Sequence, residues 1–323
     1  MPTFPRALRS VVALCALGLA LAAAAATPAH ALRPSLTVGI GDQKPGMFTD
    51  PLFGELGVRD ARIVVPWDVR TIDWQAQDVD AWMRAARRAR SRVLVTFSNS
   101  RGEGRRRVLP TPERFKYEFQ RFRERYPWAT TFAVWNEPNH CGQPTCTRPA
   151  LVAAYYRKLR QACPRCTILP AELLDMPNMI RWTRQLRRAL RVEPKIWGLH
   201  NYVDANRMST ARTRSLLRAV KGDVWLTETG GLVARRNRRK ETVGFTEGTQ
   251  HAARVTRFVL DRLAGTSRRI SRVYLYHWDT ISPQDSWDSA LIGPRGPRPA
   301  FTVLDGLLRR QRVLIARQRA ARR

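Results

Sequence analysis

Two glutamates stand in sequence contexts that suit acid–base or nucleophilic chemistry. Glu137 lies in Val-Trp-Asn-Glu-Pro-Asn, and Glu228 lies in Val-Trp-Leu-Thr-Glu-Thr-Gly-Gly. Each follows an apolar, β-branched run and precedes Pro, Asn or Gly, a pattern that predicts a carboxylate at the C-terminal end of a buried strand. Two carboxyl groups placed in this way can cleave a glycosidic bond: one protonates the leaving oxygen, and the other attacks the sugar or activates water.

The elements that must position these glutamates alternate along the chain. Strands are predicted at residues 36–41, 61–67, 92–98, 131–137, 167–172, 196–202, 224–228 and 273–278. Helices are predicted at residues 78–90, 112–125, 151–161, 179–190, 213–220, 249–263 and 300–310. This alternation predicts a single-domain α/β fold, a (β/α)8 TIM barrel. A doubly wound open sheet is the alternative, but the sequence has no G-x-G-x-x-G or Walker loop.

The C-terminal ends of barrel strands meet on one face, where active sites of this fold lie. The predicted ends carry arginine, amide, histidine, aromatic and carboxylate groups, namely Arg62, Ser98, Asn99, Asn136, Glu137, His200, Tyr202, Glu228 and Trp278. Aromatic rings with polar neighbours match the apolar faces and polar edges of pyranose sugars. Glu172 and Asp175 are interpreted as loop carboxylates outside the site. Trp287, in the loop after the last strand, either stacks on a distal sugar or packs that loop.

These motifs resemble those of the clan A glycoside hydrolases, a large group of (β/α)8 retaining glycosidases. Asn-Glu-Pro at 136–138 is similar to the clan's strand-four acid/base motif, and Thr-Glu-Thr-Gly at 227–230 is similar to its strand-seven nucleophile motif. His-Asn-Tyr at 200–202 resembles the strand-six motif of family 5. The set of motifs taken together is also similar to that of family 39-type enzymes. Ser98-Asn99 departs from the histidine that many family 5 members carry at the end of strand three.

The resemblance implies roles for these residues. Glu137 would be the general acid and then the general base, with a pKa raised by apolar surroundings and by Glu228. Glu228 would be the nucleophile, kept ionised by Arg62 and Tyr202. The implied substrate-binding residues are Asn136, Arg62, His200, Tyr202 and Trp278. Core packing is the alternative for His200 and Trp278, and neither a metal nor a cofactor is implied.

The first 31 residues are predicted to be a secretory signal peptide. Arg6 and Arg9 precede an apolar run at 11–26, and Ala29-His30-Ala31 fits a cleavage site. A transmembrane anchor is the alternative, but the run is short for a span of about 20 residues. The predicted organisation is therefore a signal peptide at 1–31, a glycosidase-like catalytic domain at 32–310 and a basic tail at 311–323. The mature protein is expected to be extracellular, with no membrane span.

Four cysteines follow the predicted signal peptide, and exported proteins usually oxidise such a set. A four-cysteine zinc site is the alternative, because Cys141 and Cys146 are followed by Cys163 and Cys166. A predicted helix separates the two pairs, and about 14 helical residues span roughly 20 Å. Disulfides need Cα atoms within about 7 Å. Local bridges, Cys141–Cys146 and Cys163–Cys166, are therefore predicted.

The chain carries a net charge of +31, with 57 Lys and Arg against 26 Asp and Glu. One interpretation is attraction to an anionic cell-wall polymer, and the other is arginine bias on solvated helix faces. Basic residues do not interleave with aromatics, so no specific nucleic-acid partner is predicted. The predicted function is a secreted retaining O-glycosidase acting on β-linkages of a poly- or oligosaccharide. The alternative is a non-catalytic glycan- or wall-binding barrel that uses its basic surface.

Overall fold

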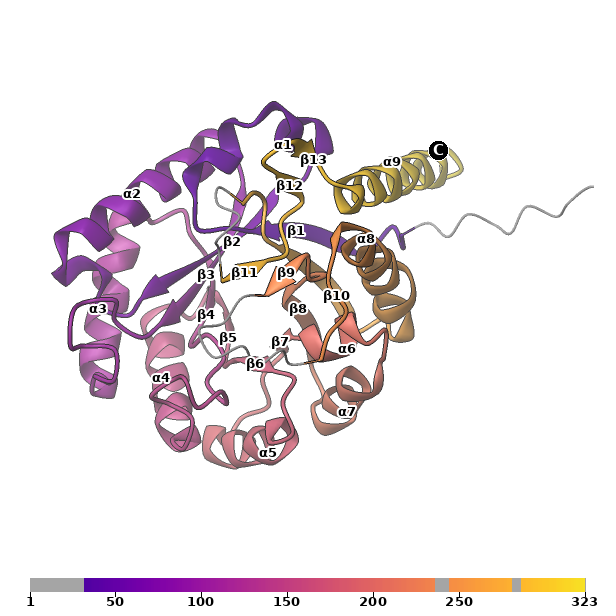
Figure 1. Ribbon diagram of the computed structural model, residues 1–323. Helices are drawn as coiled ribbons and strands as arrows, with labels where there is room; N and C mark the ends of the chain where they lie inside the picture. Colours follow the sequence, from indigo (N-terminus) through magenta and orange to yellow (C-terminus); the bar gives the residue numbers. More distant parts are fainter. Residues whose placement is uncertain (1–31, 236–243, 281–285, 323) are drawn as a thin grey trace, which may run out of the picture. The chain divides into compact units, whose positions relative to one another are not determined.

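The computed structural model describes residues 32–235, 244–280 and 286–322. Its main sheet is parallel and curls into a barrel with helices around the outside (Figure 1). The strands follow the order β5-β4-β3-β2-β1-β10-β8-β7-β6. Their bounds are β1 Thr37–Gly41, β2 Asp60–Pro66, β3 Arg92–Ser98, β4 Thr131–Ala133, β5 Thr167–Leu169, β6 Glu172–Leu174, β7 Ile196–His200, β8 Asp223–Thr229 and β10 Ile270–Tyr276. The TIM-barrel prediction is confirmed.

The strands β5 and β6 are two parts of the single strand predicted at 167–172. Pro170 separates them, and proline has no N–H to donate to a sheet. β5 pairs with β4, while β6 pairs with β7 and Glu172 bridges back to Asn136 after β4. The break therefore falls where the ring closes, and it leaves Glu172 pointing into the barrel.

The helices lie between the strands in sequence and cover the outside of the ring (Figure 1). Their bounds are α1 Pro51–Leu56, α2 Asp73–Arg88, α3 Pro112–Arg125, α4 Pro149–Ala162, α5 Met179–Leu190, α6 Tyr202–Asn206, α7 Ala211–Ala219, α8 Thr249–Arg257 and α9 Pro299–Ala320. Proline at the first turn begins α3 and α4, and the Thr111 hydroxyl accepts from the Arg114 N–H. Short pieces complete the fold: η1 Pro45–Thr49, η2 Val69–Thr71, η3 Phe258–Leu263, η4 Ala264–Thr266, and the small ladders β9 Ala234–Arg235 with β11 Trp287–Asp288 and β12 Ile292–Gly293 with β13 Gly296–Pro297.

Apolar residues fill two separate regions, as the alternation of side chains along strands requires. The main core lies between strands and helices and includes a cluster of phenylalanines around Phe97. A smaller cluster lies inside the barrel and consists of Leu94, Ala133, Leu169, Trp225 and Tyr274. This inner cluster fills the barrel interior, so the charged groups described below lie against packed apolar side chains.

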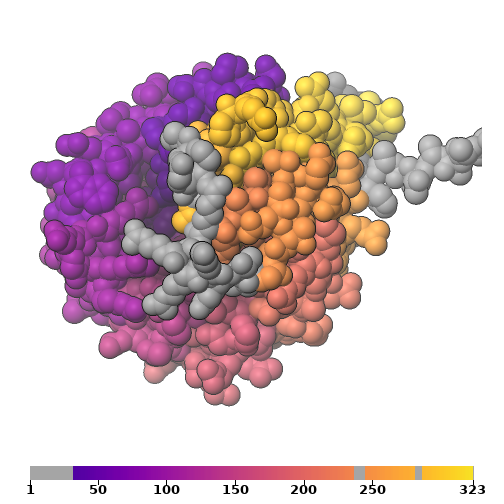
Figure 2. Space-filling view, viewed as in Figure 1, coloured from indigo at the N-terminus to yellow at the C-terminus, as the bar shows by residue number. Residues whose placement is uncertain are grey.

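The beginning and end of the described chain meet in space. β1 pairs with β10, and α9 lies beside the elements near the N-terminal end (Figure 2). The side-chain amide of Gln311 donates to the carbonyls of Arg33 and Leu36, and Arg312 donates to the carbonyl of Leu56. The predicted domain boundary at residue 310 falls inside α9. The predicted signal peptide lies outside the described residues.

Both predicted disulfides are present. Cys141 is bonded to Cys146, and Cys163 is bonded to Cys166. In the parts of the chain that the structure describes, no helix combines the length and the apolar character needed to cross a bilayer.

Candidate active site

Arg62 is the centre of a buried cluster at the C-terminal ends of the strands. It projects into the barrel from β2 and is 1% exposed. Its Nη1 donates to Glu228 at 2.7 Å, and its Nη2 donates to Oδ1 of Asn136 at 2.8 Å. Its Nε and Nη2 also donate to the two carboxylate oxygens of Glu172, at 3.1 and 2.5 Å. One guanidinium therefore connects four strand positions of the barrel.

Glu228 reaches this cluster because β8 contains an extra residue immediately before it. The register pairs Leu199 of β7 with Leu226 and then pairs His200 with Glu228. A bulge of this kind changes the direction of a side chain and is common beside active sites. One carboxylate oxygen accepts from Arg62, and the other accepts from the Tyr202 hydroxyl at 3.0 Å. Two donors thus fix the orientation of this carboxylate.

Glu137 follows β4 in an unusual backbone conformation. Its φ is 47°, in the left-handed region that residues with a side chain rarely adopt. Strain of this kind costs on the order of 1–3 kcal/mol and is concentrated at functional sites. In this conformation Oε1 of Glu137 lies 3.0 Å from Nδ1 of His200.

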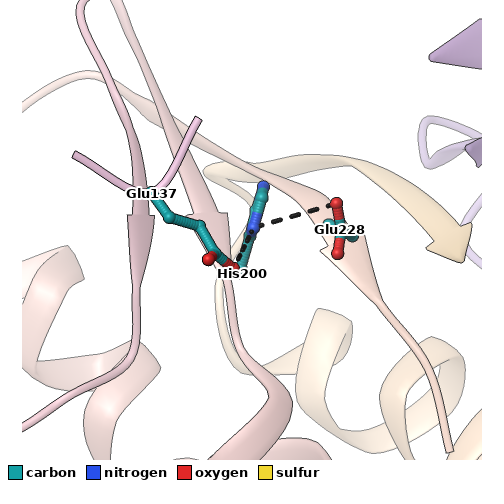
Figure 3. Close-up of side chains that lie close together, drawn as sticks. All are labelled: Glu137, His200 and Glu228. Atoms are coloured by element: carbon teal, nitrogen blue, oxygen red, sulfur yellow. Dashed lines mark hydrogen bonds and ion pairs between the residues drawn. The ribbon is translucent and has the colours of Figure 1, made fainter. Parts of the chain in front are cut away.

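His200 lies between the two predicted catalytic carboxylates (Figure 3). Its Nδ1 is 3.0 Å from Glu137 and 3.9 Å from Glu228. Each of the three residues presents an atom within 4.8 Å of the other two. A metal ion could bridge such a spacing, but the buried guanidinium of Arg62 already provides the positive charge beside Glu228.

Glu172, which the sequence analysis placed outside the site, lies at its base. Its side chain is fully buried, and it accepts from Arg62 and from the Thr96 hydroxyl at 2.9 Å. Nε2 of His200 is 3.3 Å from its Oε2. The signal in the sequence was a lone carboxylate at the end of an otherwise apolar strand, because a charge in that position needs buried partners.

Gly198 makes room for Glu172. It lies on β7 with its Cα facing the barrel interior, and a Cβ placed there would stand 2.7 Å from Cγ of Glu172 and 3.0 Å from the Ala171 carbonyl. The absence of a side chain at this position is what allows Glu172 to lie beneath His200.

Gly198→Ala should therefore displace Glu172 and destabilise the protein by about 1–3 kcal/mol, the usual cost of overpacking. Chemical denaturation measures the change. Gly54→Ala is the matched control, because no atom within 4 Å would meet its Cβ and the position lies in α1. Equal effects of the two substitutions would contradict this account of Gly198.

Opposite charges hold the base of the site in its ionised form. Burial alone would lower the pKa of Arg62, but the charges of Glu172 and Glu228 outweigh it and raise that pKa. Burial alone would raise the pKa of Glu172, but Arg62 and His200 lower it to about 2. Glu172 is therefore a fixed negative charge that positions Arg62 and His200.

The pKa of Glu137 differs from the expectation. The resemblance implied a raised pKa, and burial does act in that direction. The hydrogen bond and charge of His200 outweigh burial, so the pKa of Glu137 lies below its ordinary value. Burial would lower the pKa of His200, but the charge of Glu228 and the bonds to Glu137 and Glu172 raise it to about 9. Below about pH 9, His200 and Glu137 therefore share one proton, which lies mainly on the imidazole.

His200→Gln should move the alkaline limb of the kcat/KM profile to lower pH. The shared proton leaves the parent protein only as the pH rises through about 9. Without the imidazole, the Glu137 carboxyl must carry that proton alone, and a carboxylic acid releases it at lower pH. The measurement is kcat/KM from about pH 4 to about pH 10 on an aryl glycoside. An unchanged alkaline limb would show that His200 does not hold the proton.

Trp278 lies in the core, which was the alternative to the substrate-binding role that the resemblance implied. It is 1% exposed, its indole N–H donates to Asp50 at 2.9 Å, and its ring packs edge-on against Phe53. The strand β10 ends at Tyr276, two residues before the predicted end, so Trp278 turns into the core. Tyr276 lines the cavity in its place.

A cavity of about 500 Å³ opens beside the carboxylates. Its wall combines acidic and aromatic side chains, namely Glu137, Glu228, Tyr202, Phe245, Tyr276 and Trp287. Trp287 packs edge-on against Tyr202 with ring centroids 4.7 Å apart, and Tyr202 contacts Glu228. The aromatic surface is therefore continuous with the Glu228 carboxylate.

No protein-family model and no curated protein matches this sequence. Solved structures do resemble it. A family 39 glycoside hydrolase from Bacteroides cellulosilyticus superposes with a TM-score of 0.58 at 14% identity, over 85% of this chain and 64% of that chain. Xylanase B from Clostridium stercorarium gives 0.59 at 16%, over 83% and 96%. A GH5_18 protein from Streptomyces cattleya, solved with GlcNAc, gives 0.59 at 16%, over 87% and 81%.

The chain has the fold of the barrel glycoside hydrolases. Identities this low establish the fold alone, and the chain spans about two thirds of the length of the family 39 structure. Within this glycoside hydrolase fold, the structure brings Arg62, Asn136, Glu137, His200, Tyr202 and Glu228 together at one end of the barrel. It leaves Trp278 outside that cluster.

Proposed function

We propose that this protein is a secreted retaining glycosidase that hydrolyses β-glycosidic bonds in a poly- or oligosaccharide. The observation that carries the proposal is the approach of the Glu137 and Glu228 carboxylates to within 4.8 Å beside one cavity. Retaining enzymes place their carboxyl groups about 5–5.5 Å apart, whereas inverting enzymes leave about 6.5–9.5 Å for a water molecule. The short separation favours direct attack by a carboxylate on the sugar.

Glu228 suits the role of nucleophile. Arg62 and Tyr202 each donate to one of its oxygens, which aims the carboxylate in one direction. Attack forms a bond from a Glu228 oxygen to the anomeric carbon while the bond to the leaving oxygen breaks. Water later cleaves the glycosyl ester and restores the carboxylate.

Glu137 suits the role of acid and then base. A bound sugar excludes water from the cavity, which raises the pKa of a carboxyl group and moves the shared proton from His200 toward Glu137. Glu137 then protonates the leaving oxygen. Once Glu228 is esterified its negative charge is gone, so Glu137 loses its proton readily and can accept one from water.

The remaining residues support binding of a sugar. Oδ1 of Asn136 accepts from Arg62, so its amide group presents N–H donors that suit a sugar 2-hydroxyl. Tyr276 and Trp287 supply aromatic surface on the cavity wall. Secretion is supported by the signal-like N-terminal sequence and by the two disulfides.

The test is the intact mass of the protein after exposure to 2-deoxy-2-fluoro glycosides of the gluco, manno, xylo and galacto series with good leaving groups. A retaining nucleophile is trapped as a covalent adduct, and peptide mapping should place it on Glu228. Glu228→Ala, exposed in parallel, should gain no mass. An adduct on another residue, or none with folded protein across the series, would count against the proposal.

A further inference from the structure

The inner layer of the site contains its own counter-charges. Three carboxylates, those of Glu137, Glu172 and Glu228, stand against the cations of Arg62 and His200. Three negative charges against two positive ones leave a net charge of −1, whether the shared proton lies on His200 or on Glu137. The inner layer can therefore balance only one positive charge among the residues around it.

The outer layer of the same cavity is positively charged. Arg207, Arg212 and Arg235 line it, and among the described residues no carboxylate forms an ion pair with any of the three. The other acidic residue on this wall is Asp175, whose side chain accepts from the backbone N–H groups of Val203 and Asp204. Burial raises the pKa of Asp175 to about 7, so its charge is incomplete at neutral pH.

Two of these arginines are held by aromatic rings rather than by acids. The Arg235 guanidinium lies over Trp287 at 5.7 Å, and the Arg207 guanidinium lies over Phe245 at 5.7 Å. Stacking occupies the face of a guanidinium and leaves its N–H groups, which lie in the plane, free to donate. Trp287 also packs on Tyr202, and the Tyr202 hydroxyl donates to Glu228. Only the Trp287 ring therefore separates the Arg235 guanidinium from Tyr202.

We propose that the glycan cleaved at this site carries carboxylates, and that Arg207 and Arg235 bind uronic acid residues of a β-linked acidic oligosaccharide. A planar guanidinium matches a carboxylate with two parallel hydrogen bonds, which a neutral hydroxymethyl group cannot offer. Arg212 is anchored to the backbone carbonyl of Asp175 and adds positive charge to the same wall. This inference rests on the proposed glycosidase function and specifies its substrate class.

Binding to a variant that cannot cleave its ligand tests the inference. In the Glu228→Ala background, β-1,4-linked hexamers of glucuronate and mannuronate are compared by calorimetry with hexamers of glucose and mannose, which differ only at C6. At least one acidic hexamer should bind about 10-fold more tightly than its neutral match at low salt, the worth of a charge-assisted hydrogen bond. The preference should shrink at high salt.

Arginine substitutions in the same background locate the effect. Arg207→Gln and Arg235→Gln should each weaken binding of the acidic hexamer several-fold, while Arg218→Gln, an exposed arginine on α7, should not. Equal affinities for acidic and neutral hexamers, binding of neither pair, or equal losses in all three variants would overturn the inference. These outcomes leave the glycosidase proposal standing if a neutral fluoroglycoside still labels Glu228. That proposal fails instead if the Glu228→Ala protein hydrolyses a substrate of the parent, whichever hexamer binds.

Discussion

Glu228→Ala should lower kcat/KM by about four orders of magnitude or more on any aryl glycoside that the parent cleaves, because the proposed nucleophile is gone. The side chain is partly exposed at the cavity, and Arg62 keeps its bonds to Glu172 when Glu228 is removed, so the fold should survive. Azide can enter the space left by the carboxylate and attack the same face of the sugar. It should restore turnover and give a glycosyl azide of inverted configuration.

Glu55→Ala is the control for this substitution, since Glu55 is an exposed glutamate on α1. Its activity should equal that of the parent, and azide should have no effect. Hydrolysis by the Glu228→Ala protein at close to the parent rate would falsify the assignment of Glu228. Rescue that gives a product of retained configuration would show that azide replaces a different group.

Glu172→Ala should destabilise the protein by about 3–5 kcal/mol, the cost of removing one partner of a buried ion pair. Arg62 and His200 would remain buried with one fewer carboxylate each. Activity should fall as well, because Arg62 also holds Glu228 and Asn136. Urea unfolding, followed by tryptophan fluorescence, measures the stability change.

The pH dependence of this effect has a definite sign. The pKa of Glu172 falls from 4.5 to about 2 on folding, so its ion pair contributes stability above about pH 4.5 and loses it as the pH falls toward 2. The parent and Glu172→Ala should therefore differ most near neutral pH. Glu124→Ala removes an exposed partner of Arg121 and should leave the midpoint unchanged. A similar small shift for both variants would refute the role given to Glu172.

The fold was predictable because the pattern of apolar residues repeats at every strand. The limits of β3 and α3 agree with the predicted 92–98 and 112–125. The errors lie where tertiary structure decides the outcome. The regular strand predicted at 131–137 ends at Ala133. The N–H groups of Val134 and Asn136 still donate to the carbonyls of Leu169 and Phe97, and the chain turns away only at Glu137, where φ is positive. The break between β5 and β6 could have been predicted from Pro170, since proline cannot continue a central strand.

The residues that meet at this end of the barrel were predictable where they stand in short motifs, and less so where they only support their neighbours. Asn136, Glu137 and Glu228 occur in short, distinctive motifs. Glu172 has no motif, and its importance follows only from its burial against Arg62. The pKa of Glu137 depends on the position of His200, which no spacing along the chain specifies. Tyr276 and Trp278 are both aromatic, and only the end point of β10 determines which one faces the cavity.

The pairing of β1 with β10 has a consequence for the order in which the molecule can be assembled. A polypeptide that emerges from the ribosome, or from an export channel, with its first residues leading must wait for β10 before the free edge of β1 finds its partner. During that interval the edge can pair with other extended segments, a known route to aggregation. The hydrogen bonds from the Gln311 side chain to the Arg33 and Leu36 carbonyls can form only later still, when α9 has emerged. Folding of this barrel thus depends on the synthesis of its last helix, α9. A truncation within α9 would therefore lower the yield of folded protein more than the activity of the molecules that do fold.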